Sequence, residues 1–132
     1  MNLFSITDVG RRREINEDYI YTSDKPVGNL PNLFIVADGM GGHNAGDYAS
    51  KHAADKAVEV IASCTDEYDA ENILQKAIDD ANTYIHKMSE KDEELKGMGT
   101  TFVAATFEGN HVTVANVGDS RLYVINEFIT QI

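Results

Sequence analysis

Carboxylate side chains recur at the ends of strand-like segments in this sequence. Asp38 directly follows an apolar run, the pair Glu17-Asp18 directly precedes an aromatic one, and Asp119 lies in a turn between two strand-like segments. Hard cations such as Mg²⁺ and Mn²⁺ prefer carboxylate, carbonyl and water oxygens, and Gly39 offers an unhindered carbonyl. On spacing alone, the same residues also fit solvent-exposed turns. The pattern therefore indicates a candidate cation site at one edge of a sheet, with ordinary turn residues as the alternative.

A glycine-rich segment lies between this apolar run and a helical pattern, which raises the question of a nucleotide site. A P-loop needs Lys and then Ser or Thr after Gly46, but Asp47 and Tyr48 follow it here. A dinucleotide fingerprint that begins at Gly39 fails at its third glycine, which is Asn44. The sequence therefore disfavours both kinds of nucleotide site.

The composition is strongly acidic. The 132 residues include 22 Asp and Glu against 11 Lys and Arg, a formal net charge of -11, which argues against binding to nucleic acid or to anionic membrane surfaces. An anionic substrate still fits if bound cations reverse the local charge. No stretch is long and apolar enough to span a membrane, and no export signal is visible. The single cysteine, Cys64, excludes an intrachain disulfide, so we expect a cytoplasmic protein.

Apolar periodicity predicts an α+β fold in which antiparallel strands flank a central pair of helices. The run Leu33–Ala37 is apolar throughout, which predicts a strand buried on both faces. Strands are expected at Phe4–Thr7, Tyr19–Thr22, Leu33–Ala37, Thr101–Phe107, Val112–Val117, Leu122–Ile125 and Phe128–Ile132, and helices at Ala45–Ile61 and Leu74–Met88.

Four segments, in this order and spacing, resemble successive motifs of the metal-dependent protein phosphatase 2C family, and most closely its bacterial serine/threonine phosphatases. The resemblance runs from about Thr7 to the last residue and implies an antiparallel β-sandwich flanked by helices. The four segments are Arg13-Glu14-Ile15-Asn16-Glu17-Asp18, Val36-Ala37-Asp38-Gly39-Met40-Gly41-Gly42-His43, Gly99-Thr100-Thr101 and Asn116-Val117-Gly118-Asp119-Ser120-Arg121-Leu122.

The resemblance also implies a site with two or three Mn²⁺ or Mg²⁺ ions. Asp38 would bridge two ions, and the carbonyl of Gly39 would complete the coordination of one of them. Glu17 and Asp18 would bind an ion directly or through water, and which of the two binds it directly is left open. Asp119 matches a position that helps to hold a third ion.

Further positions carry expectations from the resemblance. Arg13 matches the arginine that grips phosphate, for which a guanidinium fork is well suited. Met40 stands where some family members have a histidine, so the identity of a general acid is open, with His43 as a weaker candidate. Thr100 and Thr101 are expected to be structural strand residues near the site.

The implied function is hydrolysis of phosphoserine and phosphothreonine in proteins by a metal-activated water. The expected partners are phosphorylated proteins, with a serine/threonine kinase acting on the same substrates. In the family, two further aspartates beyond the matched segments complete the metal site, and no acidic residue follows Glu127. The resemblance therefore implies that residues 1–132 are the N-terminal half of one catalytic domain. The alternative is a truncated or degenerate phosphatase-like module that binds metal or a partner without catalysis.

Overall fold

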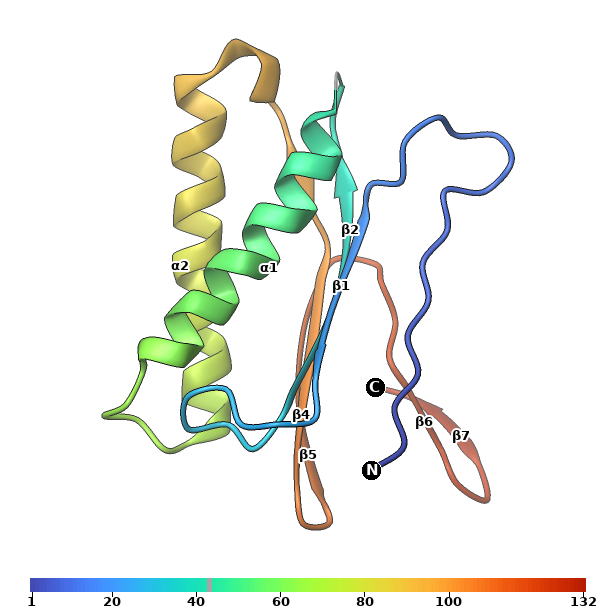
Figure 1. Cartoon of the computed structure of the whole chain (residues 1–132), viewed down its shortest axis with the longest axis vertical. Coiled ribbons are helices and arrows are strands. Elements are labelled where there is room, and N and C mark those ends of the chain that lie inside the picture. The colour runs from blue at the N-terminus through green and yellow to red at the C-terminus, as the bar shows by residue number, and fades with distance from the viewer. Residues whose placement is uncertain (43) are drawn as a thin grey trace.

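Two helices cover one face of an antiparallel sheet in the computed structural model, which describes residues 1–42 and 44–132 (Figure 1). The strands are β1 (Asp18–Ser23), β2 (Leu33–Met40), β3 (Gly99–Thr100), β4 (Phe102–Glu108), β5 (His111–Val117), β6 (Tyr123–Ile125) and β7 (Ile129–Gln131). The helices are α1 (Ala45–Ser63), α2 (Ala70–Lys91) and the short 3₁₀ helix η1 (Glu93–Leu95). The main sheet has the order β1-β2-β4-β5 with β3 beside β2, and β6 and β7 form a separate hairpin.

The antiparallel α+β arrangement is confirmed, and two details of the prediction are wrong. Phe4–Thr7 is not a strand in the structure, because its backbone has no neighbouring strand to pair with. The strand predicted at Leu33–Ala37 is not buried on both faces, since Leu33 and Ile35 are buried while Val36 is 45% exposed. The helices cover only one face of β2, so its side chains alternate between core and surface.

Small side chains let α1 lie close against the sheet. Its inward face carries Ala49, Ala53 and Ala57, all buried. The Tyr19 hydroxyl on β1 donates to Oδ1 of Asp55 on α1 at 3.2 Å, which ties the edge strand to the helix. In the described part of the chain, neither helix has the length and apolarity that a membrane crossing requires.

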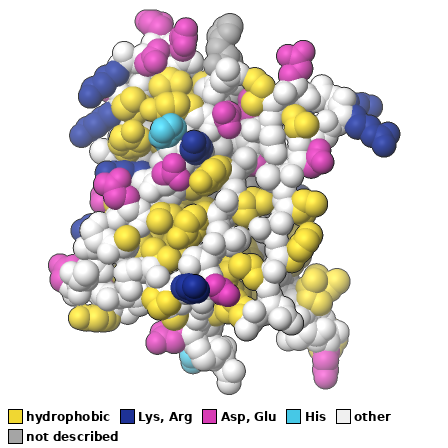
Figure 2. Space-filling view, in the orientation of Figure 1, with side chains coloured by type: hydrophobic (Ala, Val, Ile, Leu, Met, Phe, Trp, Pro, Cys, Tyr) yellow, Lys and Arg dark blue, Asp and Glu magenta, His cyan; other side chains and the backbone are white. Residues whose placement is uncertain are grey.

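The opposite face of the sheet is poorly covered. Residues 1–6 lie over it without filling a hollow of about 610 Å³, and Phe4 and Phe107 on its border are 84% and 43% exposed. The β6–β7 hairpin projects from the body and carries exposed apolar side chains (Figures 1 and 2). The chain exposes 8841 Å², whereas a compact monomer of 14.5 kDa exposes about 6,900 Å². The total accessible surface thus exceeds what a compact monomer of this mass exposes.

A buried asparagine joins the start of β2 to the end of β4. Asn32 Nδ2 donates to the carbonyl of Phe107 at 2.9 Å, and its Oδ1 accepts from the Phe107 N–H at 2.7 Å. The buried Thr106 hydroxyl donates to the Asn32 carbonyl at 2.7 Å. These bonds fix the end of the β2–β4 ladder that lies farthest from Asp38.

We expect Asn32→Ala to lower the free energy of unfolding by about 2 kcal/mol or more, because it leaves the Phe107 N–H and carbonyl without their partner. Asn72→Ala, the same change at an exposed position of α2, should stay within about 0.5 kcal/mol. Urea denaturation of each variant measures both values. Equal stability of the two variants would show that the hydrogen bonds of Asn32 do not hold β2 and β4 together.

Candidate metal centre

The register of β1 and β2 places Asp18 directly opposite Asp38. Alternation along β2 directs Ala37 into the core and Asp38 to the exposed face, away from the helices. Cross-strand neighbours share a face of the sheet and have Cβ atoms about 5 Å apart. Two residues that are distant in sequence therefore present a pair of carboxylates at one end of the strand ladder.

The electrostatics of this pair are unfavourable without a cation. The pKa of Asp18 is raised from its ordinary value of 3.8, first by burial and then by the charge and hydrogen bonding of Asp38, with a smaller contribution from Glu17. The positive charge of Arg13 acts in the opposite direction. A divalent cation between the two carboxylates would remove the repulsion between them.

A hollow of about 230 Å³ lies over this pair. The structure brings four of the predicted site residues together around it, namely Arg13, Glu17, Asp18 and Asp38. It adds Asp8, which sequence reasoning missed because an isolated carboxylate in an irregular segment carries no motif signal. The complete lining is Asp8, Val9, Arg13, Ile15, Asn16, Glu17, Asp18 and Asp38.

Asn16 holds the loop that leads into this hollow. Its Oδ1 accepts from the Asp18 N–H at 3.0 Å, and its Nδ2 donates to the Thr7 hydroxyl at 2.7 Å. The amide thus links the N-terminal segment to the first residue of β1. Asn16 belongs to one of the four motif segments, but this supporting contact depends on the folded path of residues 7–16.

Glu17 lies against the beginning of α1 as well as on the hollow. A Cβ added to Gly46 would lie 2.6 Å from Oε2 of Glu17, so only glycine leaves room for the carboxylate there. The Glu17 carbonyl accepts from the Gly39 N–H at 3.0 Å. The partial positive charge of a helix N-terminus favours a carboxylate at this place. Glycine at position 46 thus serves a close approach between the helix and the acidic group.

Gly39 and Asp119, the two other predicted ligands, do not line the hollow. Gly39 pairs with Thr100 across the β2–β3 ladder. Asp119 is exposed in the turn after β5, whose next residue, Ser120, is hydrogen-bonded to Thr101. Thr101 is in turn bonded to Asp38, so the Asp119 turn is attached to the same end of the sheet.

The oxygen donors around the hollow fit a hard divalent cation in kind. They are carboxylates, and the nearest two already face each other, as a shared ion requires. Within residues 1–42 and 44–132, however, no three or more Asp, Glu, His or Cys side chains lie close enough together to ligate one ion. The described residues therefore bring together oxygen donors of a suitable kind without a complete set of ligands.

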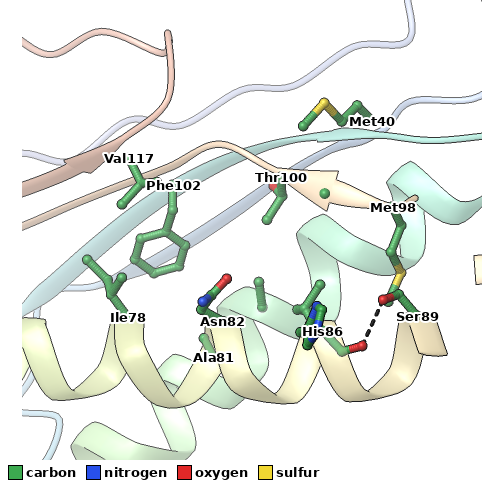
Figure 3. A pocket seen from close by; sticks show the side chains of 13 residues that line it. Met40, Ile78, Ala81, Asn82, His86, Ser89, Met98, Thr100, Phe102 and Val117 are labelled. Atoms are coloured by element: carbon green, nitrogen blue, oxygen red, sulfur yellow. Dashed lines mark hydrogen bonds between the residues drawn. The ribbon is translucent and has the colours of Figure 1, made fainter. Parts of the chain in front are cut away.

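The position of Met40 separates it from the acidic hollow. Its side chain lies over Gly99, with Cε 2.8 Å from where a Cβ of that glycine would be. It borders a different hollow of about 220 Å³ between α2 and the strands β3 and β4 (Figure 3). A thioether has no proton to donate, so Met40 cannot act as a general acid. The other candidate, His43, lies outside the described residues.

Comparison with known proteins supports the resemblance seen in the sequence. The model of the family described as Protein phosphatase 2C matches residues 10–128. A serine/threonine phosphatase, stp, of Listeria monocytogenes serotype 4b is 45% identical over 127 residues, which cover 93% of this chain and 49% of that protein. The serine/threonine protein phosphatase PstP of Mycobacterium tuberculosis is 35% identical over 92% of this chain and 22% of its own length. The chain thus spans half or less of these relatives.

Solved structures show the same fold. The crystal structure of Stp1 from Staphylococcus aureus aligns with a TM-score of 0.83 and 39% identity, covering 96% of this chain and 50% of that one. The catalytic domain of PstP in complex with two manganese ions aligns with a TM-score of 0.80 and 34% identity, covering 95% and 51%. On the family match, which extends over most of the sequence, the chain belongs to the protein phosphatase 2C family.

Proposed function

We propose that this chain is part of a metal-dependent protein phosphatase that hydrolyses phosphoserine and phosphothreonine in proteins. The observation that carries the proposal is the Asp18–Asp38 pair beside Arg13 on a single hollow. Paired carboxylates attract divalent cations, and a guanidinium attracts phosphate oxygens. The two features together suit a phosphate ester that binds next to a cation.

The named relatives support this proposal. Those with 34–45% identity are called serine/threonine or protein phosphatases, and one was crystallised with two manganese ions. We extend to this chain the use of two or three Mn²⁺ or Mg²⁺ ions per complete site. Phosphorylated proteins as substrates, a kinase that modifies them and a cytoplasmic location belong to the same proposal.

We assign the binding of the ions to Asp18, Asp38 and Glu17, together with the carbonyl of Gly39. Asp119 would help to hold a further ion that is bound more weakly. When bound, such ions supply Lewis acidity and a water nucleophile of lowered pKa for in-line attack on phosphorus. The carboxylates keep the ions at the exposed end of β2, where a phosphate group can enter from solvent. The charge of the ions changes an acidic hollow into one that accepts an anionic substrate.

Arg13 has a separate task in this proposal. Its guanidinium lines the hollow and acts electrostatically on Asp18, so it lies near the place where the phosphate oxygens would bind. A guanidinium can donate two parallel hydrogen bonds to phosphate, which fixes the orientation of the group as well as binding it. The contribution of Arg13 to in-line attack is therefore to orient the ester.

We also propose that residues 1–132 form the N-terminal half of one catalytic domain. The chain spans about half of the solved relatives, and the sheet face opposite the helices is left open. About 1,900 Å² of accessible surface above that of a compact monomer agrees with a missing layer of structure. The partial ligand set favours, for this polypeptide alone, the alternative of a metal-binding module with little catalysis.

Asp18→Asn tests the cation site through stability. In metal-free buffer the variant should melt at a higher temperature than the original chain, because it removes a carboxylate whose pKa is raised by burial and by the charge of Asp38. Millimolar Mn²⁺ should then raise the melting temperature of the original chain more than that of the variant. Asp24→Asn, in the exposed loop after β1, is the control and should match the original chain in both buffers. An equal Mn²⁺ effect in all three proteins contradicts the assignment.

Joining residues 1–132 to the C-terminal half of Stp1 from Staphylococcus aureus tests catalysis. We expect this fusion to hydrolyse p-nitrophenyl phosphate only with Mn²⁺ or Mg²⁺, while residues 1–132 alone show little turnover. Asp38→Asn should lower the rate of the fusion by about a hundredfold or more, as expected for loss of a metal ligand. Activity that survives chelation or this substitution would refute metal-dependent hydrolysis.

Arg13→Lys in the same fusion tests the phosphate grip. Lysine keeps the charge but loses the bidentate geometry, so KM for p-nitrophenyl phosphate should rise by about tenfold. Arg12→Lys makes the same chemical change at a residue that does not line the hollow and should leave KM unchanged. Initial rates over a range of substrate concentrations give both values. Equal KM values for the two variants would remove Arg13 from the site.

A further inference from the structure

The segment Gly99-Thr100-Thr101 replaces backbone hydrogen bonds of the sheet with side-chain ones. The Thr101 N–H donates to the Asp38 carbonyl at 2.9 Å, as in an ordinary antiparallel ladder. The return bond is different, because the Asp38 N–H donates to the Thr101 hydroxyl at 3.0 Å. The Thr101 carbonyl instead accepts from the Thr100 hydroxyl at 2.8 Å. A side-chain oxygen therefore holds the backbone of Asp38, at the interruption between β3 and β4.

The same hydroxyl reaches the turn that carries Asp119. Oγ1 of Thr101 and Oγ of Ser120 lie 2.6 Å apart, within hydrogen-bond distance. The Thr101 methyl group packs against Gly118, where an added Cβ would lie only 2.8 Å from Cγ2 and φ is +99°. The Ser120 carbonyl accepts from Asn116 Nδ2 at 3.0 Å. Both chain neighbours of Asp119 are thus in contact with Thr101.

We infer that Thr101 is a positioning residue that sets the place of Asp119 relative to Asp38. The inference rests on the proposed metal centre, in which both aspartates hold ions. A hydroxyl has one proton and two lone pairs, so Oγ1 can accept from Asp38 and also share a hydrogen bond with Ser120. One atom therefore joins two carboxylate-bearing segments that are far apart in the sequence.

This arrangement predicts a measurable effect on cation affinity. Groups that orient metal ligands from behind contribute about 10–100-fold to the affinity of a site. Thr101→Val keeps the shape of the side chain and removes only the hydroxyl, whereas Thr101→Ser keeps the hydroxyl and removes the methyl group. Ser120→Ala removes the other member of the pair. Thr113→Val makes the same change at a half-buried position in β5 and serves as the control.

The test is a Mn²⁺ titration of residues 1–132, in which binding is monitored by the paramagnetic broadening of backbone amide resonances. This measurement requires no turnover. Thr101→Val should weaken the apparent Mn²⁺ affinity by about tenfold or more. Thr101→Ser should recover most of the loss, and Thr113→Val should bind as the original chain does. The double variant Thr101→Val/Ser120→Ala should be no weaker than Thr101→Val, because both changes break the same link.

The results distinguish a failure of the proposed metal centre from a failure of the positioning role of Thr101. An original chain without Mn²⁺-dependent broadening near Asp18 and Asp38 contradicts the metal centre, and with it the role of Thr101. If the Thr101→Val variant has the same Mn²⁺ affinity as the original chain, the role of Thr101 is overturned and the metal centre stands. If Thr101→Val fails to fold, Ser120→Ala decides the matter. In that case, unchanged affinity in Ser120→Ala overturns the inference.

Discussion

Two like charges are held opposite each other at one end of the β1–β2 ladder, and the rest of the site depends on that juxtaposition. The register that pairs Asp18 with Asp38 is fixed by the sheet itself. Burial and the second carboxylate raise the pKa of Asp18, so the folded chain carries an electrostatic cost that a divalent cation would relieve. The acidic site is thus poised for a cation by the fold that forms it.

The elements around the pair serve to keep it in place. Ala49, Ala53 and Ala57 let α1 lie close to the sheet, and the beginning of this helix meets Glu17 through Gly46. Asn32 holds the far end of the β2–β4 ladder with hydrogen bonds to Phe107. The face that carries Asp18 and Asp38 is also the face that the helices leave open. A second layer of structure would therefore cover the apolar part of that face and approach the carboxylates at its edge.

The sequence predicts the element types well because helical and strand periodicities are strong in α1, α2, β4 and β5. It places Asp38 at the end of a strand and Asp18 at the start of another. It does not predict that the two face each other, because the β1–β2 register depends on the path of residues 24–32, which join the two strands. The strand expected at Phe4–Thr7 is wrong because alternation alone does not supply a pairing partner.

Interactions that replace one hydrogen-bond type with another were also beyond sequence reasoning. The sequence predicts a structural role for Thr101, but nothing in its residue type shows that its hydroxyl takes the place of a backbone carbonyl opposite Asp38. All the ligand assignments, those of Asp18 and Asp38 as well as those of Glu17, Gly39 and Asp119, remain predictions. Crystals of this chain soaked in Mn²⁺ and measured at the manganese absorption edge test the central claim most directly. We predict an anomalous peak in coordinating contact with Asp38 on the side that faces Asp18, and a map without a peak at that edge of the sheet would contradict the account.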